Sequence, residues 1–455
     1  MLENIKPKSI ISGITRRKSR FESSTILTII FSTLFEISKT RILGTVSDYL
    51  LIKIAKMKRN NNFKFAVGLQ LYTKHQHQRA NNLFSSIDNF RNLTPRAVYL
   101  ISLCASFHMN LRILERIEVE SDTFSIKLFV RGLILHNSSL EDSVDYFMQV
   151  HSRYLAERGK EVERRNLPEY VRYSINISKP LVQSPTNKYQ DGLLGHLESK
   201  STNFIVLPPG VSDVILISYT SSYLFALSDK VIGRIRKAHH HAIFLIISIS
   251  PFENESKISM FCKTLSLKFG NIFWRLVVSP FDLPISSSVI RLVIAQELFE
   301  VHHSKSILVL DGDTSFIKVD PVQVWEDLGR NFDIGVLQNE SCCPWERISL
   351  GFTILNNTES TKEFLLRFDI YVTAQILEDR AFWMLDQAAA FLVLKAMLKN
   401  AQDYGSNGIH IFDLSSLVSL REFIFTDKLL VNLKLEAKAS NLDFISELAE
   451  DLYIP

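Results

Sequence analysis

The chain consists of two parts that differ in the spacing of their apolar residues. From residue 25 to about residue 165, apolar positions recur every three or four residues, and β-branched runs are scarce. That spacing places apolar side chains on one face of an α-helix. After about residue 205, continuous apolar runs alternate with helical patterns, which is typical of buried parallel strands. The sequence therefore predicts an all-α region followed by an α/β region.

The helical part contains a weak internal repeat. The segment FAVGLQL at residues 65–71 returns as FVRGLIL at residues 129–135, and YLISLCA at residues 99–105 lies between them. A second apolar helical pattern follows the first and third copies. The small residues Gly68 and Gly132 predict that the two helices of each pair approach closely.

Helix pairs at this spacing resemble degenerate tetratricopeptide repeats, which stack into a solenoid. The resemblance implies a packing or protein-interaction unit, and thus a protein partner for this region. The Trp and closing Pro of the repeat pattern are absent, apart from Pro95. A plain helical bundle is therefore the alternative.

The change of pattern also predicts the boundaries between segments. Residues 155–205 are first highly charged and then rich in Pro, Ser, Asn and Gly, which indicates a linker. We predict a basic, flexible N-terminus at residues 1–24, a helical domain at residues 25–165, a linker at residues 166–205 and an α/β domain at residues 206–455.

Composition and charge narrow the class of protein. Of the 455 residues, 46% are hydrophobic and 22% are charged, which is typical of globular proteins. The net charge is only +4, but the first 60 residues contain 12 Lys and Arg against 4 Asp and Glu. Such a segment can contact nucleic acid or an anionic membrane face. We expect no nucleic-acid partner and interpret the basic N-terminus as solvated.

Cysteine usage and the first apolar run predict the compartment. Four cysteines without a CxxC pair indicate neither a disulfide scaffold nor a zinc knuckle. The first apolar run, residues 24–37, contains Glu36 and is too short to span a bilayer. We expect a cytoplasmic protein, with peripheral membrane contact as an option.

The candidate chemistry lies in the stretch ILVLDGDTSFIKVDP, residues 307–321, where a buried strand ends at Asp311 and Asp313. In an extended chain, residues i and i+2 point to the same side. Gly312 between them leaves room for a ligand. Two close carboxylates repel each other unless a cation lies between them, and carboxylate oxygens suit Mg²⁺ or Mn²⁺. The pattern predicts a divalent-cation site at the strand end.

Two families place Asp-x-Asp after a strand. Haloacid-dehalogenase-like phosphatases use the first Asp as a nucleophile, but their motif continues with Thr or Val where this chain has Ser315. In those enzymes the motif usually follows the first strand, whereas about three predicted strands precede it here. The phosphatase interpretation is therefore the weaker alternative.

A longer span resembles nucleotide-sugar glycosyltransferases of the GT-A fold. Between residues 213 and 411, a helix with Arg291, the Asp-x-Asp strand, the Gly351-Phe352 strand and a helix that opens with Asp386-Gln387 follow one another in that family's order. Leu350 departs from the Asn or Ala that the family often has before the Gly. The resemblance implies a mostly parallel sheet and metal-dependent transfer of a hexosyl or related sugar.

The resemblance also implies roles for individual residues. It assigns Mn²⁺ or Mg²⁺ to Asp313 and Asp311, with His410 as third ligand. It assigns Asp386 and Gln387 to the sugar hydroxyls or the acceptor. The residues that it assigns to donor binding are Asp311, Arg291, Ser218, Thr220, Gly351 and Phe352.

The implied partners are a UDP- or GDP-sugar donor and a glycan, lipid or protein acceptor. The alternative from another class is a helical-repeat scaffold whose α/β domain has lost catalysis. Two further features have no assigned role in the resemblance. Trp345 could stack on a sugar face, and we expect the three histidines at residues 239–241 to be exposed to solvent.

Overall fold

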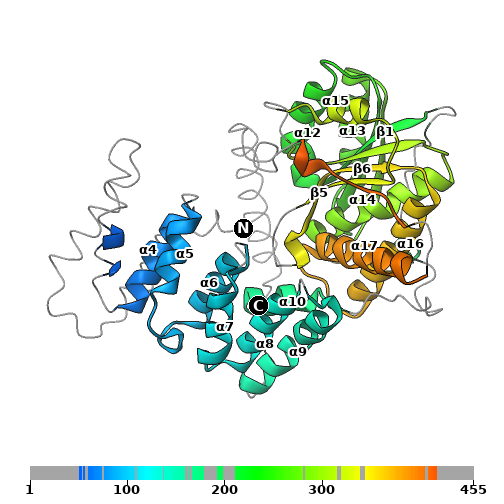
Figure 1. Ribbon diagram of the computed structural model, residues 1–455. Helices are drawn as coiled ribbons and strands as arrows, with labels where there is room; N and C mark the ends of the chain where they lie inside the picture. Colours follow the sequence, from blue (N-terminus) through cyan, green and yellow to red (C-terminus); the bar gives the residue numbers. More distant parts are fainter. Residues whose placement is uncertain are drawn as a thin grey trace, which may run out of the picture. The chain divides into compact units, whose positions relative to one another are not determined.

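The structure is a computed structural model (Figure 1). It describes residues 51–53, 55, 56, 60–73, 76–107, 110–136, 138–158, 162, 167–178, 192–197, 207, 211–279, 282–314, 319–338, 344–404 and 408–417. The predicted basic segment at residues 1–24 lies outside the described residues. None of the described helices is both long and apolar enough to span a membrane.

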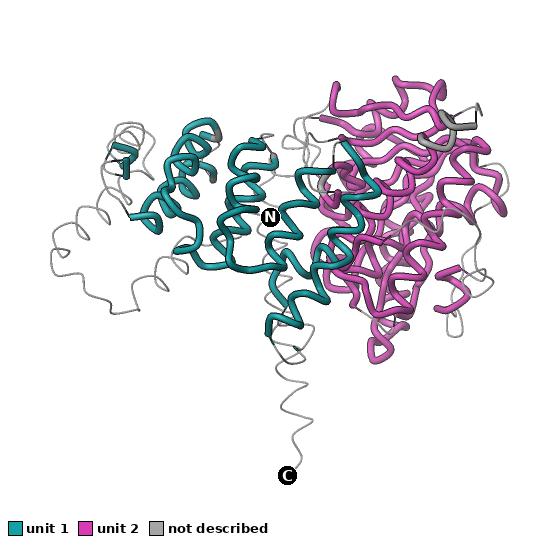
Figure 2. The backbone as a smooth tube through the Cα atoms, turned by 60° about the horizontal axis from the view of Figure 1, so that its bottom comes forward, with its two compact units in different colours: residues 1–174, 340–343 teal, residues 175–339, 344–455 magenta. Residues whose placement is uncertain are grey.

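The chain divides into two compact units (Figure 2). Unit 1 contains residues 1–174 and 340–343, and unit 2 contains residues 175–339 and 344–455. Within the predicted linker at residues 166–205, the structure contains two short helices, α10 (Glu169–Ile175) and α11 (Gly192–Leu197). Their apolar side chains, such as Val171 and Leu193, are buried.

All regular elements that the structure describes between residues 60 and 158 of unit 1 are helices. Three helix pairs follow one another, and the helices within each pair pack together. The pairs are α4 (Asn61–Thr73) with α5 (His77–Ser85), α6 (Pro95–Phe107) with α7 (Leu111–Glu120), and α8 (Phe124–Leu135) with α9 (Leu140–Arg158). The assignment of these pairs to tetratricopeptide repeats stays a prediction.

The two glycines of the internal repeat permit close contact within their pairs. The ring of Phe84 on α5 lies directly against Gly68 on α4, where a Cβ atom would overlap with it. On α8, a Cβ at Gly132 would lie 2.9 Å from the ring of Phe147 on α9. The repeated Gly and Phe therefore form the same contact twice, as the sequence predicts.

Unit 2 contains a seven-stranded sheet of the order β3-β2-β1-β4-β6-β5-β7. Neighbouring strands are parallel except where β6 pairs with β4 and with β5. This confirms the prediction of a mostly parallel α/β sheet. The strands are β1 (Asp213–Thr220), β2 (Ala242–Ile249), β3 (Ile272–Val278), β4 (Ser306–Asp311), β5 (Ile334–Gln338), β6 (Ile348–Asn356) and β7 (Ile411–Asp413).

Helices cover both faces of the sheet, which explains why its strands are apolar without alternation. One face packs into a core with α12 (Ser221–Ile235), α13 (Glu255–Phe269) and α15 (Pro321–Leu328). The other face is covered by α14 (Leu283–Glu300), α16 (Glu359–Leu377) and α17 (Leu385–Tyr404) (Figure 1). Short polar side chains begin several of these helices, because they accept hydrogen bonds from otherwise unpaired backbone N–H groups. Examples are Asn254, Asp282 and Thr358.

The expectation that the histidine run is exposed is wrong for His239, which is buried before β2. Its Nε2 lies 2.9 Å from Asp320 and its Nδ1 lies 3.2 Å from Glu326. Glu326 also contacts His241 Nε2 at 2.7 Å. Asp320 begins α15 by accepting backbone hydrogen bonds with its other oxygen. The histidines therefore join the start of β2 to α15, which sequence spacing does not reveal.

We predict that Gly68→Ala destabilises unit 1, because the added methyl group overlaps with the Phe84 ring. The expected loss is about 1–3 kcal/mol in the free energy of unfolding, measured by denaturant titration followed by circular dichroism. Phe84→Leu in the same chain should relieve the overlap, so the double variant should lose less than the two single losses together. Purely additive losses would contradict the close contact.

Candidate functional site

The two acids of the Asp-x-Asp motif lie at the carboxyl end of β4. Asp311 is the last residue of the strand and pairs in register with Ser218 on β1. Thr314 donates hydrogen bonds from both its backbone N and its Oγ1 to the backbone oxygen of Asp311, at 3.1 and 2.7 Å. These bonds close a tight turn through Gly312 and Asp313. Both carboxyl groups are partly exposed at this edge of the sheet.

Arg291 joins this strand end to two helices. It lies on α14 and is only 3% exposed. Its Nη1 donates to Asp311 Oδ1, and its Nη2 donates to Asp386 Oδ2 at 2.9 Å. Asp386 lies in the first turn of α17 and is also buried. A buried guanidinium is stable only when it is paired and hydrogen-bonded, so this bridge places three predicted residues in one cluster.

Among the described residues, this cluster contains the two carboxyl groups of Asp311 and Asp386 and the one guanidinium of Arg291. These charges and burial shift the pKa values of the two buried members. Burial raises the pKa of Asp386 and nearby Asp311 adds to that rise, while Arg291 opposes it. Burial lowers the pKa of Arg291, but the two carboxylates outweigh it and raise that pKa. Arg291 therefore stays charged, and Asp386 is the acid of this cluster that holds its proton more tightly than an ordinary aspartate.

Gly351 on β6 leaves the space that Asp311 occupies. A Cβ at this position would overlap with Asp311 Oδ2 and would lie 3.0 Å from its Cγ atom. The carboxyl group of Asp311 is thus enclosed between Arg291 on one side and the backbone of β6 on the other. Any side chain at position 351 would displace this carboxyl group, which explains why a glycine is needed there.

A constrained loop leads into Asp386. Met384 has a φ of 70°, which non-glycine residues rarely adopt. Asn176 holds this loop: its Oδ1 accepts from Phe382 N at 2.8 Å, and its Nδ2 donates to Trp383 O at 3.1 Å. Because Asn176 is more than 200 residues away in sequence, the sequence offered no sign of this support.

Two more predicted residues lie near the cluster in the fold. Thr220 ends β1 at the same edge of the sheet as Asp311, and its Oγ1 lies 3.2 Å from Ser222 Oγ. Gln387 follows Asp386, and in the amide orientation that satisfies both of its polar atoms its nitrogen donates to Ile348 O at 2.9 Å and to Trp345 O at 3.0 Å. Gln387 therefore holds the segment before β6 against α17.

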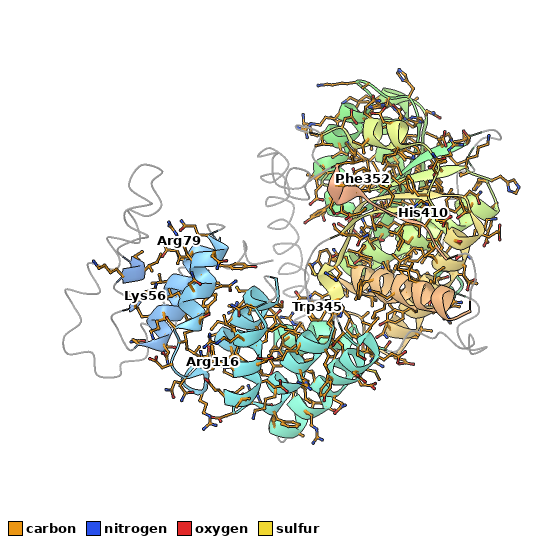
Figure 3. All side chains as sticks on the ribbon, in the orientation of Figure 1. Lys56, Arg79, Arg116, Trp345, Phe352 and His410 are labelled. Atoms are coloured by element: carbon orange, nitrogen blue, oxygen red, sulfur yellow. The ribbon has the colours of Figure 1, made fainter. Side chains whose placement is uncertain are left out.

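Three predicted residues are not brought into the cluster, and Figure 3 labels all three. Phe352 points to the opposite face of the sheet from Gly351 and is wholly buried in the core, because successive residues of a strand alternate faces. Trp345 is also wholly buried, so its ring is not exposed for stacking on a sugar. His410 lies 3.0 Å from Asn331 O, at the start of β5 and β7, which is the edge opposite to Asp311.

No group of three or more His, Cys, Asp or Glu side chains is arranged to hold a metal ion among the residues that the structure describes. The predicted third ligand, His410, is far from the acids for the reason given above. Two carboxylates at a strand end nevertheless match the usual way in which Mg²⁺ binds, through one or two carboxylates together with substrate phosphates. The residues present therefore fit a cation that arrives with a phosphorylated substrate.

Tyr219 on β1 is a residue that sequence reasoning missed. Its ring packs against Gly312, where a Cβ atom would overlap with it. Its hydroxyl group is buried and has no hydrogen-bond partner. Burial, and after it the charge of nearby Asp313, raise the pKa of this hydroxyl. Within the apolar run of β1 no pattern singled it out, and only the tertiary structure places it under the motif.

Comparison with known proteins gives neighbours at the level of structure only. No known family's sequence profile matches the chain, and no curated protein matches its sequence. Similar solved structures include the bifunctional glycosyltransferase WbbM (15% identity, 43% of this chain and 40% of that chain, TM-score 0.30). They also include the glycosyltransferase GlyE of Streptococcus pneumoniae TIGR4 (13% identity, 46% and 47%, TM-score 0.28). A third is the galactosyltransferase LgtC with donor and acceptor sugar analogs (16% identity, 48% and 81%, TM-score 0.29). The chain spans less than half of the length of the first two.

We predict that Gly351→Ala destabilises unit 2 by about 1–3 kcal/mol, because the methyl group overlaps with the Asp311 carboxyl. Gly233→Ala on α12 is the matched control, since its Cβ would meet only the Phe269 ring at an ordinary 3.5 Å. That control should be as stable as wild type, or up to about 1 kcal/mol more stable, because Ala favours helix. Denaturant titration of both variants measures the difference, and equal stabilities would contradict the enclosure of Asp311.

We predict that Asp386 makes stability depend on pH. A carboxyl group whose pKa is raised in the folded protein stabilises the fold below its ordinary value of 3.8, and this stabilisation is lost as pH rises through the raised pKa. The stability of wild type relative to Asp386→Asn should therefore fall as pH rises above 3.8. Denaturant titrations at several pH values measure it, with exposed Asp327→Asn as a control for general acid effects. A difference that does not change with pH would contradict the raised pKa.

Proposed function

We propose that unit 2 transfers a sugar, a hexosyl or related group, from a nucleotide-sugar donor to an acceptor. The observation that supports this most is the buried Arg291, which holds Asp311 and Asp386 on two sides of one guanidinium. The cluster lies beyond the carboxyl ends of parallel strands, which is where ligands bind in sheets of this kind. It gathers polar groups from β4, α14 and α17 around a partly exposed strand end.

The acids of the cluster suit the recognition of a sugar. Carboxyl oxygens accept hydrogen bonds from hydroxyl groups, and a sugar presents several hydroxyl groups in a fixed arrangement. In this proposal the exposed side of Asp311 binds sugar or ribose hydroxyls, and the buried Asp386 holds Arg291 in place beside it. Arg291 is a positioning residue, because its hydrogen bonds fix the orientation of both carboxyl groups. Ser218 and Thr220, at the end of β1, contact the nucleotide.

The surplus of negative charge suits a cation-bound diphosphate. Among the residues that the structure describes here, Asp311, Asp313 and Asp386 bring three carboxyl groups and Arg291 brings one guanidinium. We assign the cation, Mn²⁺ or Mg²⁺, mainly to Asp313, whose carboxyl group is partly exposed at the strand end. When bound, such an ion stabilises the charge of a departing nucleoside diphosphate. The acceptor belongs to one of three classes: glycan, lipid or protein.

The same geometry weighs against the phosphatase alternative. A nucleophilic carboxylate needs available negative charge on the oxygen that attacks the phosphorus atom. Asp311 would be that nucleophile, yet its carboxylate is paired with the buried Arg291, which draws on that charge. The scaffold alternative, in which unit 1 binds a protein partner and unit 2 is inactive, requires no ligand at this cluster, so a binding experiment separates the two.

We predict that Mn²⁺ together with the right nucleotide sugar raises the melting temperature of the full chain. A ligand at 100 times its Kd stabilises a protein by about 2.7 kcal/mol. A thermal-shift panel of UDP-, GDP- and CMP-sugars, each with and without Mn²⁺, measures this effect. Asp313→Ala should remove the part of the shift that requires Mn²⁺, because the variant lacks the carboxylate assigned to the ion.

Asp327→Ala is the matched control for this panel, since it removes an exposed Asp on α15. It should keep the full shift. The absence of a shift with every donor of the panel would contradict the proposal and favour the scaffold alternative. Phosphate release from an aryl phosphate that Asp311→Asn blocks would favour the phosphatase instead.

A further inference from the structure

The outer face of α13 carries the most exposed large apolar side chains that are described in unit 2. Phe252, just before the helix, is 90% exposed, Leu267 is 88% exposed and Met260 is 65% exposed. Isolated exposed apolar residues are ordinary, but several along one surface mark a binding surface. We call these three residues the α13 apolar stripe.

Met260 and Leu267 of the stripe belong to a helix that is firmly packed on its other side. Ile258, Cys262 and Leu265 of the same helix are buried in the core of unit 2, so its inner face is firmly packed. Met260 and Leu267 are seven residues apart, which places them on one line along the opposite face. Phe252 lies in the turn before the helix, at the carboxyl edge of the sheet, because it follows the end of β2.

Lysines border the stripe on both sides. Lys257 and Lys263 are exposed and lie about 60° to either side of Met260 around the helix axis. Lys257 also lies over the ring of the neighbouring Phe225, at 5.6 Å from its centroid. Of the nearby acids, Glu253 is engaged by Ser250 N and Ser221, and Asp229 is paired with Lys268. Glu255 lies in the first turn, about 140° from Met260 around the helix axis. The outer face of the helix is therefore mainly positive.

This combination fits a lipid surface better than a protein partner. Protein interfaces are enriched in aromatic residues, Met and Arg but depleted in lysine, so Phe252 and Met260 would suit such an interface whereas the bordering lysines would not. Helices that lie in a membrane interface instead carry Phe, Leu or Trp on one face with lysines beside them. Long lysine side chains can lie along the apolar zone and still place their ammonium groups at lipid phosphates. We propose that α13 docks unit 2 on an anionic membrane surface, with Phe252, Met260 and Leu267 inserted among the lipids and Lys257 and Lys263 on the headgroups.

Vesicle flotation of the full chain tests this docking, and it does not depend on sugar transfer. We expect wild type to bind phosphatidylcholine vesicles that contain phosphatidylglycerol, and to bind pure phosphatidylcholine vesicles much more weakly. The triple variant Phe252→Ser, Met260→Ser, Leu267→Ser should bind the anionic vesicles about tenfold more weakly, because it lacks the inserted side chains. Lys257→Glu with Lys263→Glu should reduce the preference for the anionic lipid.

The matched control is Val301→Ser, Leu366→Ser, Leu377→Ser, which removes three exposed apolar side chains from other helices. It should bind as wild type does. The basic N-terminal segment is present in every variant, so differences between variants report on α13 alone. Equal binding of the stripe variant and wild type would overturn the proposal, and so would a wild type that does not bind vesicles. Loss of a dimer in the stripe variant, seen by size-exclusion chromatography without vesicle binding, would assign the stripe to a second copy of the chain instead.

Discussion

The ion bridge of Arg291 is the interaction on which the arrangement of the candidate site depends. A guanidinium that is almost fully buried is costly unless charged partners surround it. Here the partners come from the end of a strand and from the first turn of a helix that is distant in sequence. The requirement to neutralise one buried charge therefore holds β4, α14 and α17 in a common geometry at the carboxyl edge of the sheet. Removal of Arg291 would leave the buried Asp386 close to Asp311 without this counter-charge.

Several neighbouring features follow from this bridge. Asp311 must lean toward Arg291, and the space for that orientation exists because β6 has a glycine at position 351. Asp386 must reach Arg291 from the start of α17, and Asn176 holds the loop before it. Burial then raises the pKa of Asp386 above that of an ordinary aspartate. The site thus combines a fixed, buried acid with acids at the edge that solvent or a ligand can reach.

The fold class and part of the cluster could be predicted from sequence because they depend on local pattern. Continuous apolar runs between helical segments indicated the strands, and Asp311 and Asp313 ended one of them visibly. Phe352 and His410 show the limit of this reasoning. Gly351 and Phe352 are adjacent in the motif, but adjacent residues of a strand face opposite sides of the sheet. The edge of the sheet at which His410 lies is set by the pairing of the short strand β7 with β5, which the sequence does not reveal. Tyr219 was not singled out because its contact with Gly312 joins two strands that are far apart in sequence.

The sequence by itself determined the two periodicities, the strand that ends in Asp-x-Asp and the order of the segments that resemble a nucleotide-sugar transferase. These features depend on the spacing of residues along the chain, because the period of apolar side chains decides which face of a helix or strand can be buried. Only the tertiary structure decided that Arg291 lies between Asp311 and Asp386, that His239 is buried between two acids and that the outer face of α13 is left exposed. Charge pairing and burial depend on distances between residues that are far apart in sequence, and the folded chain alone sets those distances.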